Sequence, residues 1–245
     1  MHLLLNEKII KKAIEDYISL GKSSALINRV LSGIQIFFNW CSDEDQQYID
    51  KKDYIKKYKQ QSIKTIRAPY TEEEYNMILD YFTNKVVNKE FCYFIQFLWH
   101  TGARAGEALN IMGEDIDFKN MYIRIPNKIF KGQQETLLLS DTAFNILWEH
   151  IKYHAINIED KVFSWKDTTL PYRILHRAER KLGIRIKGRG LHGFRRSFAD
   201  KLFKNEFAVD RVQEIMRHRN IQTTIDHYKN FNKRNVIKEM NEKLK

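Results

Sequence analysis

The stretch EDIDFKNMYIRIPNKIFKGQQETLLL, residues 114–139, decides the fold class, because its apolar residues are spaced differently from those elsewhere in the chain. "MYIRI" alternates, which is typical of a half-buried strand, and "ETLLL" is a short apolar run of strand length. Lys119 with Asn120, and Lys131 with Gly132, are turn candidates. The stretch predicts a small antiparallel sheet of about three strands.

The remaining periodic segments have helical spacing. Thr71 and Glu74 form a capping-box signature that opens one helix, and Gly102 is placed to end another. The expected helices cover residues 7–20, 24–41, 71–83, 88–100, 104–111, 141–155, 169–182, 192–204, 209–217, 222–229 and 233–244. We therefore expect a mainly α fold with one small antiparallel β-sheet, an α+β architecture.

Composition narrows the class of partner. The 245 residues carry a formal net charge of +11, which favours a polyanion, nucleic acid first. The two cysteines permit no disulfide framework and suit a reducing compartment. No signal peptide is predicted, and the most apolar segment, FCYFIQFLWH, is too short to cross a membrane. We expect a cytoplasmic protein with no membrane partner.

A basic segment separates two regions of the chain. Residues 48–67 interleave lysines with aromatic residues, and Pro69 marks a boundary. We expect a short helical N-terminal domain at 1–62, a linker at 63–70 and a larger domain at 71–245. The candidates for phosphate contact in this segment are Lys56, Lys57, Lys59, Lys64 and Arg67.

The first chemical constellation is HTGARAGEALNI, residues 100–111. Arg104 stands at a predicted helix start, three residues before Glu107, so the two side chains can share a face. An arginine is unfavourable at a helix N-terminus unless an anion binds there, because the helix dipole prefers negative charge. The alternative is a surface Arg–Glu pair.

The second constellation is GRGLHGFRRSFAD, residues 188–200, in which His192 and Arg195 are again three apart at a predicted helix start. The alternative is a basic helix, including Arg196, that lies on a DNA backbone without chemistry. A separate candidate is Lys131, which lies at the predicted hairpin tip and could donate a proton. A solvated turn lysine is the alternative for Lys131.

The third constellation is MRHRNIQTTIDHYKNF, residues 216–231. His218 precedes Tyr228 by ten residues, across a turn in which Thr223 and Thr224 can cap a short helix. A tyrosine hydroxyl titrates near about 10, and cationic neighbours favour its phenolate. Together with the two arginines, these residues suit phosphoryl transfer through a tyrosine, because arginines can clamp the non-bridging oxygens.

This order of residues resembles the tyrosine recombinase (phage integrase) family. The match runs over about residues 70–230, and residues 23–41 also resemble part of the family's N-terminal core-binding domain. Lys128 is a second candidate for the hairpin lysine. The matching residues are Thr101, Gly102, Arg104, Glu107, Lys131, His192, Arg195, His218, Thr223, Thr224 and Tyr228.

The resemblance implies an activity and a set of roles. Arg104 and Arg195 would hold the scissile phosphate, and Tyr228 would form a 3′-phosphotyrosyl link. Lys131 would be the general acid, His192 and His218 would assist, and Glu107 would support the site. The implied partner is a double-stranded DNA site bound by a homo-tetramer, with a monomer or dimer when free, and a C-terminal helix that docks on a neighbour. No metal or cofactor is implied, and the enzyme would work at the nucleoid.

The chain departs from the family pattern at three positions near the predicted site. The family often has Leu-Gly before the late histidine, where this chain has Met216 and Arg217. The residue after His192 is Gly193, where Asp is common.

Three alternatives stay open. A type IB topoisomerase uses similar residues and would relax DNA without joining two sites. A catalytically silent DNA-binding protein would keep only the fold. His150 and His154 have zinc-like spacing, but no glutamate follows the first histidine, and an exposed helix face is the preferred interpretation.

Overall fold

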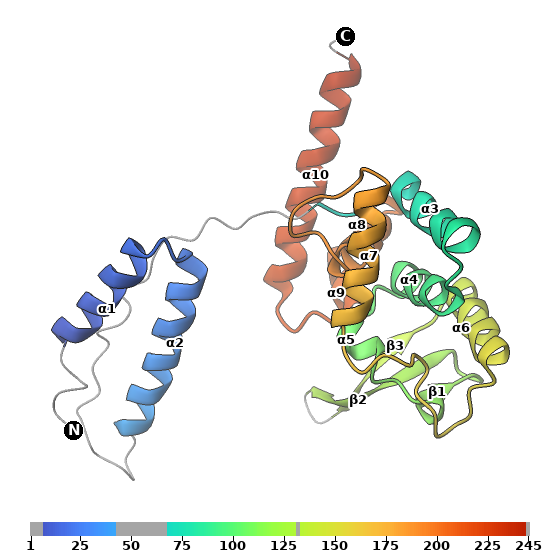
Figure 1. The fold of residues 1–245 in the computed structure, drawn as a ribbon, viewed down its shortest axis with the longest axis horizontal. Helices are drawn as coiled ribbons and strands as arrows, with labels where there is room; N and C mark the ends of the chain where they lie inside the picture. Colours follow the sequence, from blue (N-terminus) through green and yellow to red (C-terminus); the bar gives the residue numbers. More distant parts are fainter. Residues whose placement is uncertain (1–6, 43–67, 131–132, 244–245) are drawn as a thin grey trace. The chain divides into compact units, whose positions relative to one another are not determined.

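The computed structural model describes residues 7–42, 68–130 and 133–243 (Figure 1). The chain forms two compact units, residues 1–65 and 66–245. The described elements are helices apart from one small antiparallel sheet. The predicted class, mainly α with a small antiparallel sheet, is confirmed.

The first unit contains a pair of helices, α1 (Glu7–Ser19) and α2 (Ser24–Cys41). Ser23 caps α2, because its hydroxyl accepts a hydrogen bond from the backbone N–H of Leu26 at 3.3 Å. The apolar faces of the two helices form a small core of Ile10, Ile14, Ile27, Leu31 and Phe38.

The core of the second unit is built around α4 (Lys89–Thr101). Phe91, Phe94 and Phe97 on this helix are fully buried. The helix contacts α6 (Asp141–His154) on one side and α8 (His192–Lys204) on another. Burying an aromatic side chain contributes about 2–3 kcal/mol, so α4 supplies much of the stability of this unit.

The element before α4 begins as the sequence predicts but ends differently. Helix α3 (Glu72–Asp80) opens with the Thr71–Glu74 capping box, in which both hydrogen bonds are formed. It then continues as a π-helix, Tyr81–Lys85. The single α-helix expected over 71–83 therefore widens in its last turn, where Phe82 is buried against Phe91.

The sheet has the order β1–β2–β3, with strands Ile116–Asp117, Tyr122–Phe130 and Gln133–Leu138. Ile123 pairs with Leu137, and both are buried. The register between β2 and β3 is irregular between Arg124 and Ile129. Pro126 lies in that interval, and a proline cannot donate a ladder hydrogen bond.

The C-terminal region of the unit is helical. Helices α9 (Val209–Met216) and α10 (Ile221–Lys243) pack with α8 around Phe203, Val212 and Met216. The last turns of α10 extend away from the rest of the unit (Figure 1). Helices α5 (Ala105–Ala108) and α7 (Thr169–Lys181) and the 3-10 turn Gly113–Asp115 complete this unit's described elements.

Two sequence expectations are wrong here. Helices expected at 222–229 and 233–244 are one continuous helix, α10, because residues 229–232 contain neither glycine nor proline to interrupt it. The predicted cap residues, Thr223 and Thr224, lie inside α10. Asn220 precedes the helix instead, and its Oδ1 accepts from the N–H of Gln222 at 2.8 Å.

The two cysteines, Cys41 and Cys92, are free and buried, as expected. None of the described helices is long and apolar enough to span a membrane.

Candidate active site

The first predicted arginine is positioned by the end of α4. Gly102 ends this helix with a left-handed backbone, φ 62°, and a Cβ at Gly102 would lie 2.4 Å from the ring of Phe198. Only glycine satisfies both conditions at low cost. The chain then turns so that Arg104 occupies the N-cap position of α5, with its side chain beside Glu107.

Glu107 joins two arginines. Its Oε1 accepts from Nη1 of Arg104 at 2.9 Å, and its Oε2 lies 3.0 Å from Nη2 of Arg217. Burial raises the pKa of this carboxyl, but Arg217 and then Arg104 lower it by more, so the pKa lies below its usual value. Glu107 is therefore ionised at neutral pH and fixes both guanidinium groups.

Arg195, on α8, is held by backbone carbonyls. It is 3% exposed and donates to the carbonyl oxygen of Gly102 at 2.6 Å and to that of Met216. Burial, together with the charges of Arg104 and Arg217, lowers the pKa of Arg195 to about 9. The group stays charged at neutral pH but carries a desolvation cost, which a bound anion would offset.

His218 follows the end of α9 and is anchored to α10. Its Nδ1 lies 2.9 Å from Oγ1 of Thr224, which is fully buried. Burial lowers the pKa of His218 to about 3, with further contributions from Arg195 and Arg104. The imidazole is therefore neutral at physiological pH, and it lies within electrostatic range of both arginines.

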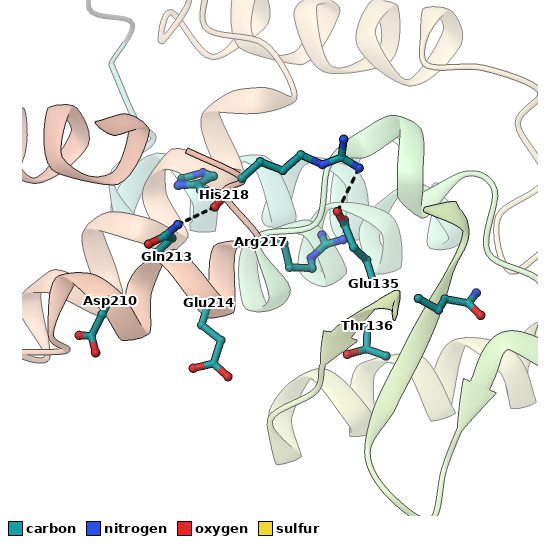
Figure 2. Close-up of a pocket in the computed structure, with 9 residues that line it drawn as sticks. Glu135, Thr136, Asp210, Gln213, Glu214, Arg217 and His218 are labelled. Carbon is teal, nitrogen blue, oxygen red and sulfur yellow. Dashed lines mark hydrogen bonds and ion pairs between the residues drawn. The ribbon is translucent and has the colours of Figure 1, made fainter. Parts of the chain in front are cut away.

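A pocket of 390 Å³ lies where the α9–α10 turn faces β3. Figure 2 shows Arg217 and His218 on the helix side of this pocket and Glu135 and Thr136 on the strand side. Arg219 also lines it, with Nη2 at 3.5 Å from Oε1 of Glu135. The pocket places β3, one strand of the predicted hairpin, beside the predicted histidine.

A second groove, of 600 Å³, contains Arg104 and His192. His192 is the first residue of α8 and is exposed. Thr168, Thr169 and the Gly188–Gly190 turn line the same groove. A surface groove with a guanidinium, an imidazole and hydroxyl groups suits a phosphate-bearing chain.

Tyr228 lies on α10, one helical turn beyond Thr224. Tyr228 is 38% exposed, and its ring centroid is 5.1 Å from that of Phe203 on α8. Its neighbour His227 contacts Asp200 with Nε2 at 2.8 Å from Oδ1, and Nη2 of Arg234 lies 2.5 Å from Oδ2 of the same carboxylate. These two contacts fasten α10 to α8 on either side of the tyrosine.

Residues 70–235 match the family model described as the phage integrase family, which is more than half of the chain. This chain belongs to the phage integrase family.

The most similar curated relatives within this family include tyrosine recombinase XerA of Saccharolobus solfataricus, 35% identical over 130 residues, which cover 53% of this chain and 42% of the relative. A probable integrase/recombinase of Acholeplasma phage L2 is 32% identical over 148 residues, covering 58% of this chain and 49% of the relative. These matches thus span less than half of each relative's length.

Two solved integrase structures have the same fold. The Tn1549 transposon integrase in complex with circular intermediate DNA aligns with a TM-score of 0.72 at 18% identity, covering 91% of this chain and 81% of that one. A lambda integrase dimer bound to a COC′ core site aligns with a TM-score of 0.69 at 16% identity, covering 91% and 80%. At these identities the likeness shows the fold alone.

Several predicted residues lie outside the described part of this integrase-family chain. Lys131 is one of them, and the alternative lysine, Lys128, lies on β2 without a described side chain. Arg196 is described and is half-buried on α8 beside Arg195. The basic residues Lys56, Lys57, Lys59, Lys64 and Arg67 also lie outside the described residues.

The departure at Gly193 has a structural reason. A Cβ at this position would lie 2.5 Å from the ring of Tyr70. Tyr70 stacks on Phe194 and donates its hydroxyl to Oε1 of Glu179 at 2.7 Å. The ring therefore replaces the side chain that the family often has after its histidine, and it ties the start of the second unit to α8.

Sequence reasoning missed the buried network around Arg189, three residues before His192. Arg189, 2% exposed, donates to Glu74 at 2.7 Å and lies 3.6 Å from Glu179. Its guanidinium also lies over the ring of Tyr70 at 4.1 Å. The signal was present in "GRG", because an arginine between two glycines in a turn is an unusual place for a solvated side chain.

Away from the predicted reaction residues, α7 and the segment that follows it carry a basic surface. A pocket of 250 Å³ is lined by four exposed arginines with Tyr172 and His176. The arginines are Arg173, Arg177, Arg180 and Arg185. Such a cluster supplies charge for a polyanion close to the groove that contains His192, because Tyr172 lines both.

The histidine pair on α6 is not the exposed face that we expected. His150 is 1% exposed, stacks on Phe163 and has Nε2 2.6 Å from the carbonyl oxygen of Val162. The expectation is wrong because α6 turns this residue toward the core, while His154 one turn later is exposed. Within the described residues, no group of three or more metal-ligating side chains converges.

Proposed function

We propose that this chain is a site-specific DNA recombinase that cleaves and rejoins strands through a 3′-phosphotyrosyl intermediate on Tyr228. The observation that carries the proposal is the convergence of Arg104, Arg195 and His218 around the backbone of residues 216–218. Three elements that are distant in the sequence bring these groups together. Membership of the phage integrase family supports the same assignment.

The chemistry needs neither metal nor ATP. The hydroxyl oxygen of Tyr228 loses its proton and attacks phosphorus, and the bond from phosphorus to the 5′ oxygen breaks. One phosphoester bond is exchanged for another, so the bond energy is retained for rejoining. Arg104 and Arg195 stabilise the charge on the non-bridging oxygens in the transition state. A 5′-hydroxyl from another strand reverses the step and completes recombination.

The remaining roles follow from position and charge. Lys131 protonates the leaving 5′ oxygen, and Lys128 is the alternative if the hairpin is shifted in register. Neutral His218 and exposed His192 assist by hydrogen bonding to the phosphate and by moving the nucleophile's proton. Glu107 supports Arg104 through the 2.9 Å contact.

The partner is double-stranded DNA at recombination sites, bound by a homo-tetramer. Residues 1–62 form the short DNA-binding domain, 63–70 the linker and 71–245 the catalytic domain, whose C-terminal helix docks on a neighbour. The exposed Val236, Ile237 and Met240 on the projecting part of α10 support that docking. The arginines of α7 and the basic segment before Pro69 contact phosphates. The enzyme acts at the nucleoid.

A nicked suicide substrate tests the proposal. After cleavage a short strand diffuses away, so rejoining is prevented and the protein–DNA adduct accumulates. We expect the wild-type protein to give a covalent band in denaturing electrophoresis. Tyr228→Phe should abolish that band while binding the same DNA with unchanged affinity, because only the hydroxyl is lost. An adduct formed by Tyr228→Phe would refute the assignment of the nucleophile.

The same assay separates the alternatives. Joining of strands from two different sites indicates a recombinase, whereas relaxation of supercoils without joining indicates a type IB topoisomerase. DNA binding with no adduct from the wild-type protein indicates a catalytically silent DNA-binding protein. Mapping the covalent cleavage on DNA that flanks the gene would identify the target.

A further inference from the structure

Arg217 stands where the family often has glycine, and its backbone has the conformation that glycine suits. It is the C-cap of α9, with φ 53° and ψ 48° in the left-handed region. A non-glycine residue in this region is strained unless its surroundings hold it there. The side chain of Arg217 must therefore make contacts that compensate.

The side chain of Arg217 is buried at the centre of the predicted site. It is 7% exposed, and its Nη2 lies 3.0 Å from Oε2 of Glu107. The other oxygen of that carboxylate accepts from Arg104. Among the described residues, Nε and Nη1 of Arg217 have no hydrogen-bond partner. The ion pair with Glu107 is therefore the contact that holds this guanidinium.

The backbone of the same turn serves both predicted catalytic arginines. The carbonyl oxygen of Arg217 accepts from Nη2 of Arg104 at 3.2 Å, and that of Met216 accepts from Arg195. A glycine at position 217 would supply this carbonyl oxygen but no guanidinium. The side chain of Arg217 thus adds a second link to Arg104, which passes through Glu107.

The guanidinium of Arg217 also changes the net charge of the cluster. Arg104, Arg195 and Arg217 lie together, and Glu107 is the carboxylate that contacts two of them. Without Arg217, Glu107 would neutralise Arg104 alone. Arg104, Arg195 and Glu107 alone would leave one positive charge, and Arg217 raises this surplus to two. The charges lie in a buried place, where they interact strongly. That surplus favours an anion such as a phosphodiester.

We propose that Arg217 is a positioning residue, which shares the carboxylate of Glu107 with Arg104 and so fixes Arg104 for the scissile phosphate. The inference rests on the proposed function for its kinetic consequence. It does not require Arg217 to touch DNA.

Three substitutions test the proposal. Arg217→Gly relieves the left-handed backbone and removes the guanidinium. Arg217→Met and Arg217→Lys both keep a long side chain and a non-glycine residue in the left-handed region. Of the two, only lysine keeps the positive charge. The measurements are the single-turnover rate of adduct formation on the suicide substrate, and the salt dependence of DNA binding in a Tyr228→Phe background.

We expect Arg217→Gly to fold and to form the adduct at least about tenfold more slowly, because displacement of a catalytic group by about 1 Å can cost up to about a hundredfold. Arg217→Lys should be faster than Arg217→Met, because it keeps the charge beside Glu107. The slope of log affinity against log salt should stay unchanged, because a residue that contacts no phosphate releases no counterion.

Three results would overturn the proposal. They are a wild-type rate for Arg217→Gly, equal rates for the Lys and Met variants, and a fall of about one in the salt slope, which would mean direct phosphate contact. A crystal structure of Arg217→Gly tests the inference without any cleavage. With one of its two cations gone, the carboxylate of Glu107 should turn and carry the guanidinium of Arg104 to a new position, away from the carbonyl oxygen of residue 217 that it contacts at 3.2 Å. An unchanged position of Arg104 would contradict our proposal. Absence of an adduct from the wild-type protein would instead refute the proposed function.

Discussion

At the scale of single residues, burial in the second unit changes the pKa values of ionisable side chains. Arg195 and His218 both have lowered pKa values because burial disfavours their charged forms. The consequences differ. Arg195 remains charged at neutral pH and is available to an anion, whereas His218 is neutral and can exchange a proton with a substrate oxygen.

His150 provides a prediction about stability and pH. Burial lowers the pKa of His150 to about 4 in the folded protein, below its ordinary value of 6.5. The folded state therefore binds fewer protons than the unfolded state between these values. The contribution of neutral His150 is fully present above pH 6.5 and is lost progressively as the pH falls toward 4. At pH 5 the loss is about 2 kcal/mol.

Replacing His150 by glutamine should remove this dependence. Glutamine can still donate to the carbonyl oxygen of Val162, but it has no proton to gain. We expect the free energy of unfolding, measured in urea at pH 5 to 8, to fall less steeply on acidification in His150→Gln than in the wild type. At pH 8 the imidazole is neutral in both the folded and the unfolded protein. The difference in unfolding free energy between wild type and variant at that pH therefore reports the loss of packing alone and serves as the reference. Parallel curves at all pH values would show that His150 does not carry the effect.

At the scale of elements, the turn between α9 and α10 organises the candidate site. It supplies carbonyl oxygens to Arg195 and Arg104 and carries His218, while α10 carries Tyr228. Because one short segment serves both the proposed phosphate-binding groups and the proposed nucleophile, movement of α10 should change cleavage more than it changes DNA binding.

Asp200 on α8 tests this coupling. Its carboxylate contacts His227 at 2.8 Å and Arg234 at 2.5 Å. Asp200→Ala should loosen α10, since a hydrogen bond to a charged group contributes about 1.5–3 kcal/mol. We expect faster amide hydrogen exchange in α10 and slower adduct formation, with DNA affinity little changed.

A matched control is available on the neighbouring helix. Arg211 and Glu214 form an ion pair at 2.9 Å with side chains 68% and 64% exposed. Exposed pairs contribute little, so Arg211→Ala should leave both measurements unchanged. If Asp200→Ala behaves like this control, the fastening of α10 to α8 has no role in positioning Tyr228.

At the scale of the whole molecule, the net charge of +11 can attract DNA in two ways. It can act as a general field, or individual basic residues can contact individual phosphates. The basic segment before Pro69 and the arginines of α7 are separate candidates for phosphate contact. Each phosphate neutralised by a protein cation makes the fall of log affinity with log salt steeper by about 0.9. Salt dependence can therefore count the contacts that a given segment makes.

We expect replacement of four lysines in the basic segment by glutamine to reduce that slope by about three to four. The measurement is equilibrium binding to the recombination site at several salt concentrations. The substituted residues are Lys56, Lys57, Lys59 and Lys64.

The control removes the same charge from exposed lysines of the second unit. If both variants lose affinity equally, general attraction rather than contact by the basic segment explains binding. The control residues are Lys119, Lys152, Lys161 and Lys166.

Local sequence signals determined a large part of this structure. The capping box at Thr71, the glycine at position 102 and the alternation near Ile123 each fix a local conformation through nearby atoms, so helix starts and the three-stranded sheet could be predicted. The family pattern also indicated Arg104, Arg195 and His218, and the structure brings these together. The continuity of α10 was missed although residues 229–232 contain no helix-breaking residue. The burial of His150 was missed because long-range packing decides it.

The roles of Arg217 and Tyr70 were decided by the tertiary structure alone. In the sequence, Arg217 is an unexplained departure from glycine, and its partner Glu107 lies more than a hundred residues earlier. Tyr70 explains Gly193 only once its ring lies against α8. The physical reason is the same in both cases. Sequence spacing specifies which face of an element a side chain occupies, whereas charge pairing and steric fit depend on which element packs against that face.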